Sequence, residues 1–283
     1  MLRIDAHHHV WDLSVRDQPW TENLAVLRRS FDVHELAPEL ARNSIDATVV
    51  VQTIATPDET PELLQLASET SFVAGVVGWI DLEARDAEDR LARLRELSGG
   101  DALVGIRHQV QSEPDPAWLE RESVQRGLSA VGRAGLAYDL LVTPDQLPAA
   151  VNAVRRNPEV RFILDHGGKP RIASSQFEPW AALIRSLAAS PNVSVKLSGL
   201  TTEAGSPWSL TQLHPYVDAL IGAFGPERMM FGSDWPVSLL AASYSRTAEA
   251  AGQLIAGLTR DEQDAVFGGN ALRWYQLPQA SGS

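Results

Sequence analysis

Residues 2–9, LRIDAHHH, combine the apolar pattern of a short strand with three histidines at its end. In a β-strand, residues two apart point to the same side, so the side chains of His7 and His9 project together while His8 points away. A second segment of this kind, residues 229–234 (MMFGSD), ends in Asp234. Two converging imidazoles and a carboxylate can bind a divalent metal, or position a water and polarise a carbonyl group.

Short apolar runs alternate with helical patterns along the rest of the chain. Several of the runs are rich in Val and Ile and contain few charges, as expected for strands that helices cover on both faces. This alternation predicts an α/β fold, a (β/α)8 TIM barrel, as a single domain over residues 1–278 with a C-terminal tail at 279–283. An open doubly wound sheet is the alternative, but no GxGxxG motif follows the first strand. The predicted strands are Leu2–His9, Ala47–Gln52, Phe72–Ile80, Ala102–His108, Ala137–Val142, Val160–His166, Val193–Ser198 and Met229–Asp234.

Amphipathic helices are predicted between these strands, and three of their starts carry a capping-box pattern. Segments 56–59 (TPDE), 143–146 (TPDQ) and 259–262 (TRDE) each begin with Thr and place Glu or Gln three residues later. The first two also place Pro at the first helical position, where its missing N–H costs nothing.

The composition excludes several classes of protein. The 283 residues carry a net charge of −12, which argues against a nucleic-acid partner or an anionic membrane surface. The chain contains no cysteine, which excludes disulfides and Cys-ligated metals and fits a cytoplasmic protein. We expect no signal peptide and no membrane span, because neither a charged-then-apolar leader nor a long apolar run is present. The expected partner is a small molecule, and the protein is expected to be a monomer or homodimer.

The predicted barrel makes a further expectation, that reactive side chains collect at the C-terminal ends of the strands. His7 and His9, Arg107, His166 and Asp234 all occupy such positions, and we predict that these five residues form the catalytic site. For other polar residues near strand ends a structural role is favoured; these are His108, Asp165, Lys169 and Lys196.

Three long irregular segments, 11–31, 111–122 and 200–210, follow strands and are expected over the mouth of the barrel. They carry tryptophans that could shape a pocket or hold the loops down. We predict that Tyr138, Trp118 and Trp235 bind the substrate. The step from Trp235 to Pro236 is expected to form a rigid turn, with a cis bond as one option, that aims the carboxylate of Asp234.

At these residues the chain resembles the amidohydrolase superfamily, in particular the amidohydrolase-related family 2. Within it, the chain is similar to the sugar-lactone and aromatic-lactone hydrolases, a group that includes L-fuconolactonase and 2-pyrone-4,6-dicarboxylate lactonase. The matching segments span nearly the whole chain: 5–11 (DAHHHVW), 105–108 (GIRH) with 113–116 (EPDP), 138–139 (YD), 165–170 (DHGGKP), 196–200 (KLSGL) and 230–237 (MFGSDWPV).

The resemblance implies a hydrolase that opens a sugar-acid lactone, L-fucono-1,5-lactone or a close relative. We predict that Asp234 acts as the general base, that His7, His9 and His166 hold the water or the oxyanion, and that Arg107 supplies positive charge. The alternatives are an aromatic or dicarboxylate lactone hydrolase, an amide hydrolase, a zinc-dependent aromatic-acid decarboxylase of the same superfamily and, outside enzymes, a sugar-acid binding barrel.

The chain also departs from the wider superfamily, which often has a Lys on the fourth strand and a metal-binding His on the fifth. Arg107 and Tyr138 stand there instead, so a binuclear metal centre is not expected. One zinc held by His7, His9, His166 and Asp234 remains open. The resemblance equally permits a metal-free site, and we slightly favour a metal that is absent or dispensable.

Overall fold

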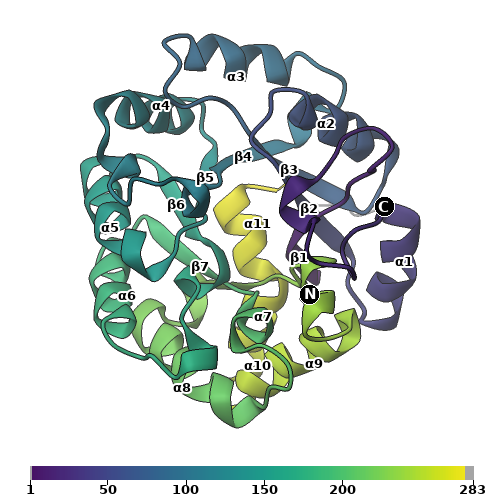
Figure 1. The fold of residues 1–283 in the computed structure, drawn as a ribbon, viewed down its shortest axis with the longest axis vertical. Coiled ribbons are helices and arrows are strands. Elements are labelled where there is room, and N and C mark those ends of the chain that lie inside the picture. The colour runs from purple at the N-terminus through teal and green to yellow at the C-terminus, as the bar shows by residue number, and fades with distance from the viewer. Residues whose placement is uncertain (1, 278–283) are drawn as a thin grey trace.

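Eight parallel strands form the centre of the structure, a computed structural model that describes residues 2–277 (Figure 1). Each strand pairs with the next along the chain, which confirms the predicted (β/α)8 barrel. All eight strands occur where the sequence predicts them, although each is one to three residues shorter than predicted. They are β1 (Ile4–His8), β2 (Ala47–Val51), β3 (Val73–Gly78), β4 (Leu103–His108), β5 (Ala137–Leu140), β6 (Arg161–Leu164), β7 (Val193–Leu197) and β8 (Met229–Phe231).

The ends of β1 and β8 close the barrel through backbone hydrogen bonds. The amide of His9 donates to the carbonyl of Trp235 at 2.7 Å, and the amide of Asp234 donates to the carbonyl of His7 at 2.8 Å. Residues 2–9 and 229–235, about 225 residues apart in the chain, are therefore neighbours in the barrel.

Helices surround the barrel, and each strand except β8 is connected to the next by at least one of them (Figure 1). Their apolar faces pack against the outer faces of the strands to form the larger core. The helices in this ring are α1 (Val33–Arg42), α2 (Glu59–Glu69), α3 (Ala87–Arg95), α4 (Glu122–Arg133), α5 (Leu147–Arg156), α6 (Trp180–Ala188), α8 (Leu210–Phe224) and α9 (Tyr244–Leu254).

Two of the three predicted capping boxes are present, those at Thr143 and Thr259. The box predicted at Thr56 is wrong. The carboxylate of Glu59 accepts hydrogen bonds from the backbone amides of Thr53, at 2.9 Å, and Ile54, at 3.1 Å, instead of turning back to Thr56. A buried carboxylate needs such donors, and those of the loop after β2 satisfy it better than a single N-cap amide.

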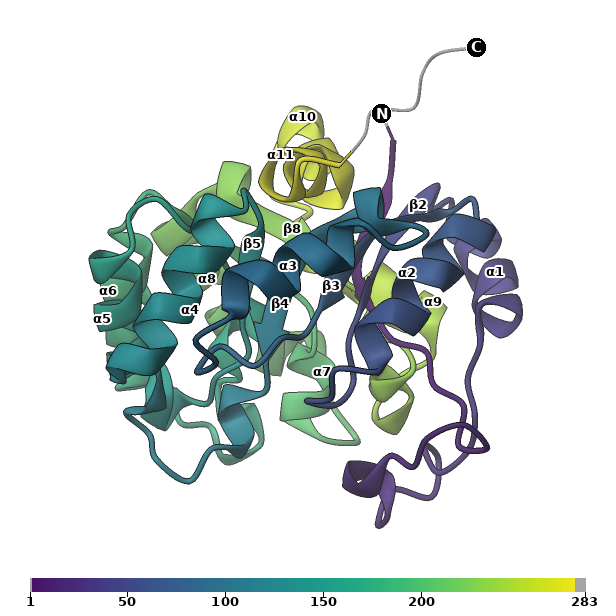
Figure 2. The ribbon, with the colours of Figure 1, turned by 90° about the horizontal axis from the view of Figure 1, so that it is seen from above.

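The two ends of the barrel are covered differently (Figure 2). The C-terminal helices α10 (Arg260–Asp264) and α11 (Asn270–Tyr275) lie over the end at which the strands begin, where Tyr275 packs against inward-facing residues such as Val49 and Val77. At the opposite end lie α7 (Leu200–Ala204) and the long loop 11–31. The C-terminal ends of the strands therefore lie at this second end, where a barrel of this kind places its active site. The predicted tail at 279–283 lies outside the described residues.

No helix within residues 2–277 combines the length and the apolar character that crossing a membrane requires.

Candidate active site

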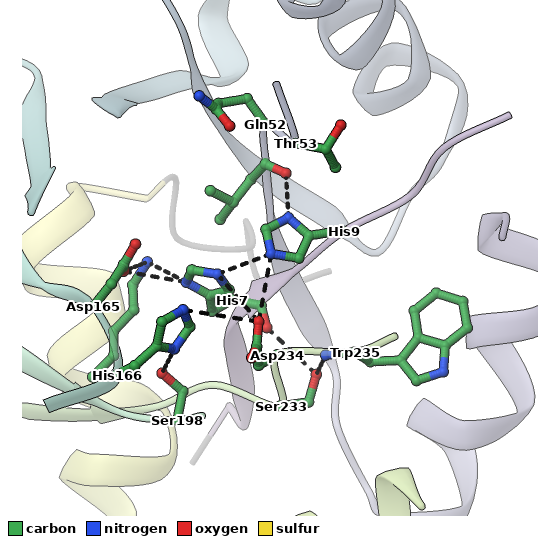
Figure 3. A network of polar contacts seen from close by, with 12 residues as sticks. His7, His9, Gln52, Thr53, Asp165, His166, Ser198, Ser233, Asp234 and Trp235 are labelled. Carbon is green, nitrogen blue, oxygen red and sulfur yellow. Dashed lines mark hydrogen bonds and ion pairs between the residues drawn. The ribbon is translucent and has the colours of Figure 1, made fainter. Parts of the chain in front are cut away.

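The side chains of His7, His9 and Asp234 meet at the C-terminal end of the barrel (Figure 3). The Nε2 atoms of the two histidines lie 3.2 Å apart. The Oδ1 atom of Asp234 is 3.7 Å from Nε2 of His7 and 3.5 Å from Nε2 of His9. The sequence expectation that the HxH pair and the last-strand Asp converge is therefore met in the geometry.

The first strand contains a β-bulge where it leads into the two histidines. The pairing of β1 with β2 shifts register between Asp5 and His8, and such bulges often redirect a side chain beside a functional site. As predicted, His8 points the other way, where its Nε2 contacts the hydroxyl of Thr48 at 2.9 Å. Burial lowers the pKa of His8 to about 3, so this ring is neutral.

Hydrogen bonding fixes the orientation of His9. Its Nδ1 lies 2.7 Å from the carbonyl oxygen of Val51, which can only accept, so Nδ1 carries the proton. In the neutral ring, the Nε2 lone pair then faces His7 and Asp234. This is the tautomer that a metal ligand or a hydrogen-bond acceptor for water requires.

His166 completes the cluster from the loop after β6. Its backbone is left-handed, with φ of 53°, and its Nδ1 contacts the hydroxyl of Ser198 at 2.9 Å. Its Nε2 lies 3.9 Å from Oδ1 of Asp234. Burial lowers the pKa of His166 to about 4, although Asp234 and Asp165 oppose the shift, so the imidazole is neutral near pH 7.

Burial would raise the pKa of Asp234, but the neighbouring imidazoles of His166, His9 and His7 outweigh it and hold the pKa below its usual value. Asp234 is therefore an ionised carboxylate among imidazoles. Its own φ is 55°, and the following bond from Trp235 to Pro236 is cis, the option that the sequence analysis allowed for this turn.

Behind His7 lies a buried network of charged groups. The Lys196 Nζ contacts Asp139 at 2.5 Å, Asp165 at 2.9 Å and Nδ1 of His7 at 2.9 Å. Arg107 donates to Asp165 at 3.0 Å and lies 3.3 Å from Nε2 of His7. Asp165 and Lys196 therefore have the structural partners that the sequence analysis favoured.

This network allows two protonation arrangements of His7. When Nδ1 accepts from Lys196, the Nε2–H can donate to the lone pair of His9. When Nδ1–H instead donates to Asp165, at 3.2 Å, the Nε2 lone pair faces the cluster. Burial, reinforced by the positive charge of Lys196, lowers the pKa of His7 well below its usual value, so either arrangement is a neutral ring.

The cluster forms the floor of a cavity of about 270 Å³. Of the five residues predicted to be catalytic, four line it; His7 lies directly beneath. Sequence reasoning missed several lining residues, among them Thr53, Gln109, Gln111 and Glu203. Thr53, Gln109 and Gln111 follow a strand within three residues, so extending the strand-end criterion into the loops would have found them, whereas Glu203 lies in α7, six residues beyond β7. Trp20 also lines the cavity.

The three residues predicted to bind substrate do not line this cavity. Tyr138 packs against Phe162 outside the barrel, because its neighbour Asp139 occupies the inward position and adjacent strand residues face opposite ways. Trp118 stacks on His108, with ring centroids 4.3 Å apart. The indole of Trp235 turns away from Asp234 and packs against Phe31 (Figure 3).

The donor set at the floor fits a single metal ion. One potential donor atom from each of His7, His9 and Asp234 lies within 4.8 Å of the others, and two imidazoles with a carboxylate are ligands that zinc accepts. His166 stands outside this compact group. A second group, His7, Asp165 and His166, is less suitable because Lys196 and Arg107 already pair with Asp165 and would repel a cation.

Known proteins resemble this chain over nearly its whole length. The chain is 41% identical over 290 residues to an L-fucono-1,5-lactonase of Burkholderia ambifaria, covering 99% of this chain and 98% of that protein. It is 39% identical to an L-fucono-1,5-lactonase of Burkholderia multivorans, covering 98% and 97%. A crystal structure of an amidohydrolase from Burkholderia multivorans with bound zinc matches with a TM-score of 0.92 and 40% identity, over 98% of this chain and 100% of that one. Residues 4–277 match the amidohydrolase family model, and the chain therefore belongs to the amidohydrolase family.

Proposed function

We propose that this protein hydrolyses a sugar-acid lactone, L-fucono-1,5-lactone or a close stereochemical relative, to the aldonic acid. The observation that carries the proposal is the position of Asp234, an ionised carboxylate beside three imidazoles at the floor of a small cavity. The two Burkholderia lactonases, which align with nearly the whole chain, narrow the reaction class to lactone opening.

In this proposal Asp234 removes a proton from a water molecule as the water attacks the lactone carbonyl carbon. The lone pair of His9, fixed by the hydrogen bond to Val51, helps to hold that water. When the tetrahedral intermediate collapses, the bond to the ring oxygen breaks and Asp234 returns its proton to the leaving alkoxide. The product is the open-chain hydroxy acid, and Asp234 is again ionised.

The negative charge that develops on the carbonyl oxygen needs donors that are already in place. Arg107 lines the cavity and is held by Asp165 and by Gln52, whose side-chain oxygen lies 3.3 Å from its guanidinium group. Because an arginine side chain stays charged at any working pH, it can stabilise the oxyanion without a proton transfer. His166, fixed by Ser198, is the second candidate donor.

If a metal takes part, we propose that His7, His9 and Asp234 hold it, as their convergence permits. A zinc ion there would polarise the carbonyl as a Lewis acid. The amidohydrolase of Burkholderia multivorans with bound zinc supports this version. A lactone is an activated ester, however, and the fixed charge of Arg107 offers a metal-free route. The cytoplasmic location and the monomeric or homodimeric state stay predictions from the sequence.

The test is a pH-indicator hydrolysis assay on a panel of sugar 1,4- and 1,5-lactones, corrected for spontaneous ring opening. Fast turnover of L-fucono-1,5-lactone or of a stereochemical relative would establish the proposal. No acceleration across the panel would contradict it and direct attention to dicarboxylate lactones and to decarboxylation. Saturable binding without turnover would instead indicate a sugar-acid binding barrel.

A further inference from the structure

The cavity above the catalytic floor has two chemically different walls. One wall is polar and comes from the loops after β4, β6 and β7, through Gln111, Lys169 and Glu203. The other is mainly apolar and comes from the loops after β1 and β8, with Trp20, Leu24, Val237 and Leu240. Gln111 follows β4, which lies across the barrel from β8. On the other side the two walls meet, because β7 neighbours β8 and α7, which carries Glu203, contacts residues 237–240.

The polar wall is built around an ion pair. The Lys169 Nζ lies 3.1 Å from Oε1 of Glu203 and donates to Oε1 of Gln111 at 3.0 Å. Three separate loops therefore meet at one ammonium group. The side chains of Lys169 and Glu203 are 26% and 22% exposed, so both charges reach the solvent of the cavity and are not sealed inside the protein.

This ion pair retains hydrogen-bonding capacity for a ligand. An ammonium group has three N–H donors. Among the described residues, Lys169 uses two of them, one for Glu203 and one for Gln111. A carboxylate has about four acceptor sites, and Lys169 occupies one. A charged donor and a charged acceptor side by side match neighbouring hydroxyl groups, because each hydroxyl both donates and accepts.

We infer that the Lys169–Glu203 pair, held by Gln111, recognises ring hydroxyls of the substrate, while the apolar wall of Leu24, Val237 and Leu240 receives its C–H or methyl edge. The inference rests on the proposed lactone hydrolysis and names the substrate as a polyhydroxylated lactone with one apolar edge. Recognition by two unlike walls orients the ring, so that its carbonyl faces Asp234 and Arg107 on the floor between them.

The experiment compares the sugar lactone that the wild-type protein hydrolyses fastest with δ-valerolactone, which has a six-membered lactone ring without hydroxyls. The variants are Glu203→Gln and Lys169→Met. We expect KM for the sugar lactone to rise about 10- to 100-fold with kcat changed little, because binding to hydroxyls is lost while the floor is intact. For δ-valerolactone, measured as a substrate and as a competitive inhibitor, the constants should stay within about twofold.

Asp145→Asn is the matched control. Asp145 forms an ion pair at 2.5 Å with Arg171, which lies two residues beyond Lys169. This pair is more exposed than the pair of Lys169 with Glu203, and neither of its residues lines the cavity. The variant should leave both lactones unaffected. Equal losses on both lactones would show that Lys169 and Glu203 only support the loops, and unchanged constants on both would show that they do not meet the ring; either overturns the inference. If the wild-type protein hydrolyses no sugar lactone, the proposed function itself fails.

Discussion

Gly199 lies against the ring of His166, so closely that an added β-carbon would come within 2.7 Å of the imidazole. The two residues follow the neighbouring strands β7 and β6, and both have a left-handed backbone, with φ of 67° for Gly199 and 53° for His166. Absence of a side chain at Gly199 is therefore what lets the His166 ring sit between Ser198 and Asp234.

We predict that Gly199→Ala reduces kcat on the sugar lactone about 10- to 100-fold, because a displacement of the order of 1 Å in a catalytic group can cost that much. The new methyl group must displace the ring of His166, and the left-handed backbone adds strain of about 1–3 kcal/mol. Steady-state kinetics combined with urea unfolding separates the two effects.

Gly205→Ala is the control for backbone strain. Gly205 has a similar φ of 72°, yet an added β-carbon would meet no atom of the described residues within 4 Å. Its ψ of 172° differs from the −9° of Gly199 and lies in a region that essentially only glycine adopts, so this variant should lose at least as much stability and keep its kcat. If both variants lose activity equally, strain in this segment, and not the position of His166, would be the cause.

The positions of the catalytic candidates could be predicted because they follow from simple periodicities. Buried parallel strands are apolar, so polar residues mark their ends, and the spacing of His7 and His9 places both on one side. The sequence does not reveal the bulge in β1, which is a matter of register between strands. That these side chains lie close together was thus predictable, while the orientation of each imidazole ring was not.

Tyr138 illustrates the limit of this reasoning. Which of two adjacent residues faces the barrel interior depends on the register with the neighbouring strand. Here Arg107 on β4 lies opposite Asp139 on β5 in the register, and both side chains point inward. Tyr138 consequently belongs to the outer core. The cavity walls were less predictable still, because Lys169 lies in a loop and Glu203 in the five-residue helix α7, which is too short for a periodicity to indicate the direction of a side chain.

Asp234→Asn should lower kcat by about 10²- to 10⁴-fold, since an amide cannot accept the proton of the attacking water. Asparagine has nearly the same shape as aspartate and tolerates the left-handed φ of 55° at this position, so the fold should survive. Circular dichroism and thermal unfolding check the fold, and initial rates check the chemistry. Turnover near the wild-type value would remove Asp234 from the role of base.

Lys196→Met should destabilise the protein by about 3–5 kcal/mol, the usual effect of removing one partner from a buried ion pair. Asp139 and Asp165 would keep their negative charges in the interior without the ammonium group that contacts both. Urea unfolding at pH 7 measures the loss. The double variant Lys196→Met/Asp139→Asn should recover part of it; no recovery would mean that packing, and not charge, explains the effect.

Stability should fall as the pH drops from about 6.5 to 5, partly through His8. The pKa of His8 is about 3 in the folded protein and near 6.5 in the unfolded chain. Between pH 6.5 and pH 5 only the unfolded chain binds the proton, which lowers the free energy of the unfolded state relative to the folded state. The expected contribution of His8 over this window is about 2 kcal/mol. Asp139, whose pKa burial raises to about 6, acts in the opposite direction.

The variant His8→Gln isolates this contribution, because glutamine can still bond to the hydroxyl of Thr48 but does not titrate. Urea unfolding of each protein at pH 6.5 and pH 5 gives the change in its free energy of unfolding. All other groups contribute equally to the two changes, so the difference between the changes is the contribution of His8. The wild-type protein should lose about 2 kcal/mol more than the variant. Parallel losses would show that His8 does not carry the proton uptake.

Removal of metal should leave most of the lactonase activity, provided that loss of the metal is verified by elemental analysis. Opening an activated ester demands less polarisation of the carbonyl than amide hydrolysis, and Arg107 supplies a permanent charge at the floor of the cavity.

Zinc should nevertheless bind to the metal-free protein, because His7, His9 and Asp234 form a compact donor group. Asp234→Asn should weaken that binding. Calorimetric titration with zinc tests binding independently of turnover. Loss of activity on chelation, restored by one equivalent of zinc, would assign the polarisation of the carbonyl to the metal and make Asp234 a ligand instead of the base.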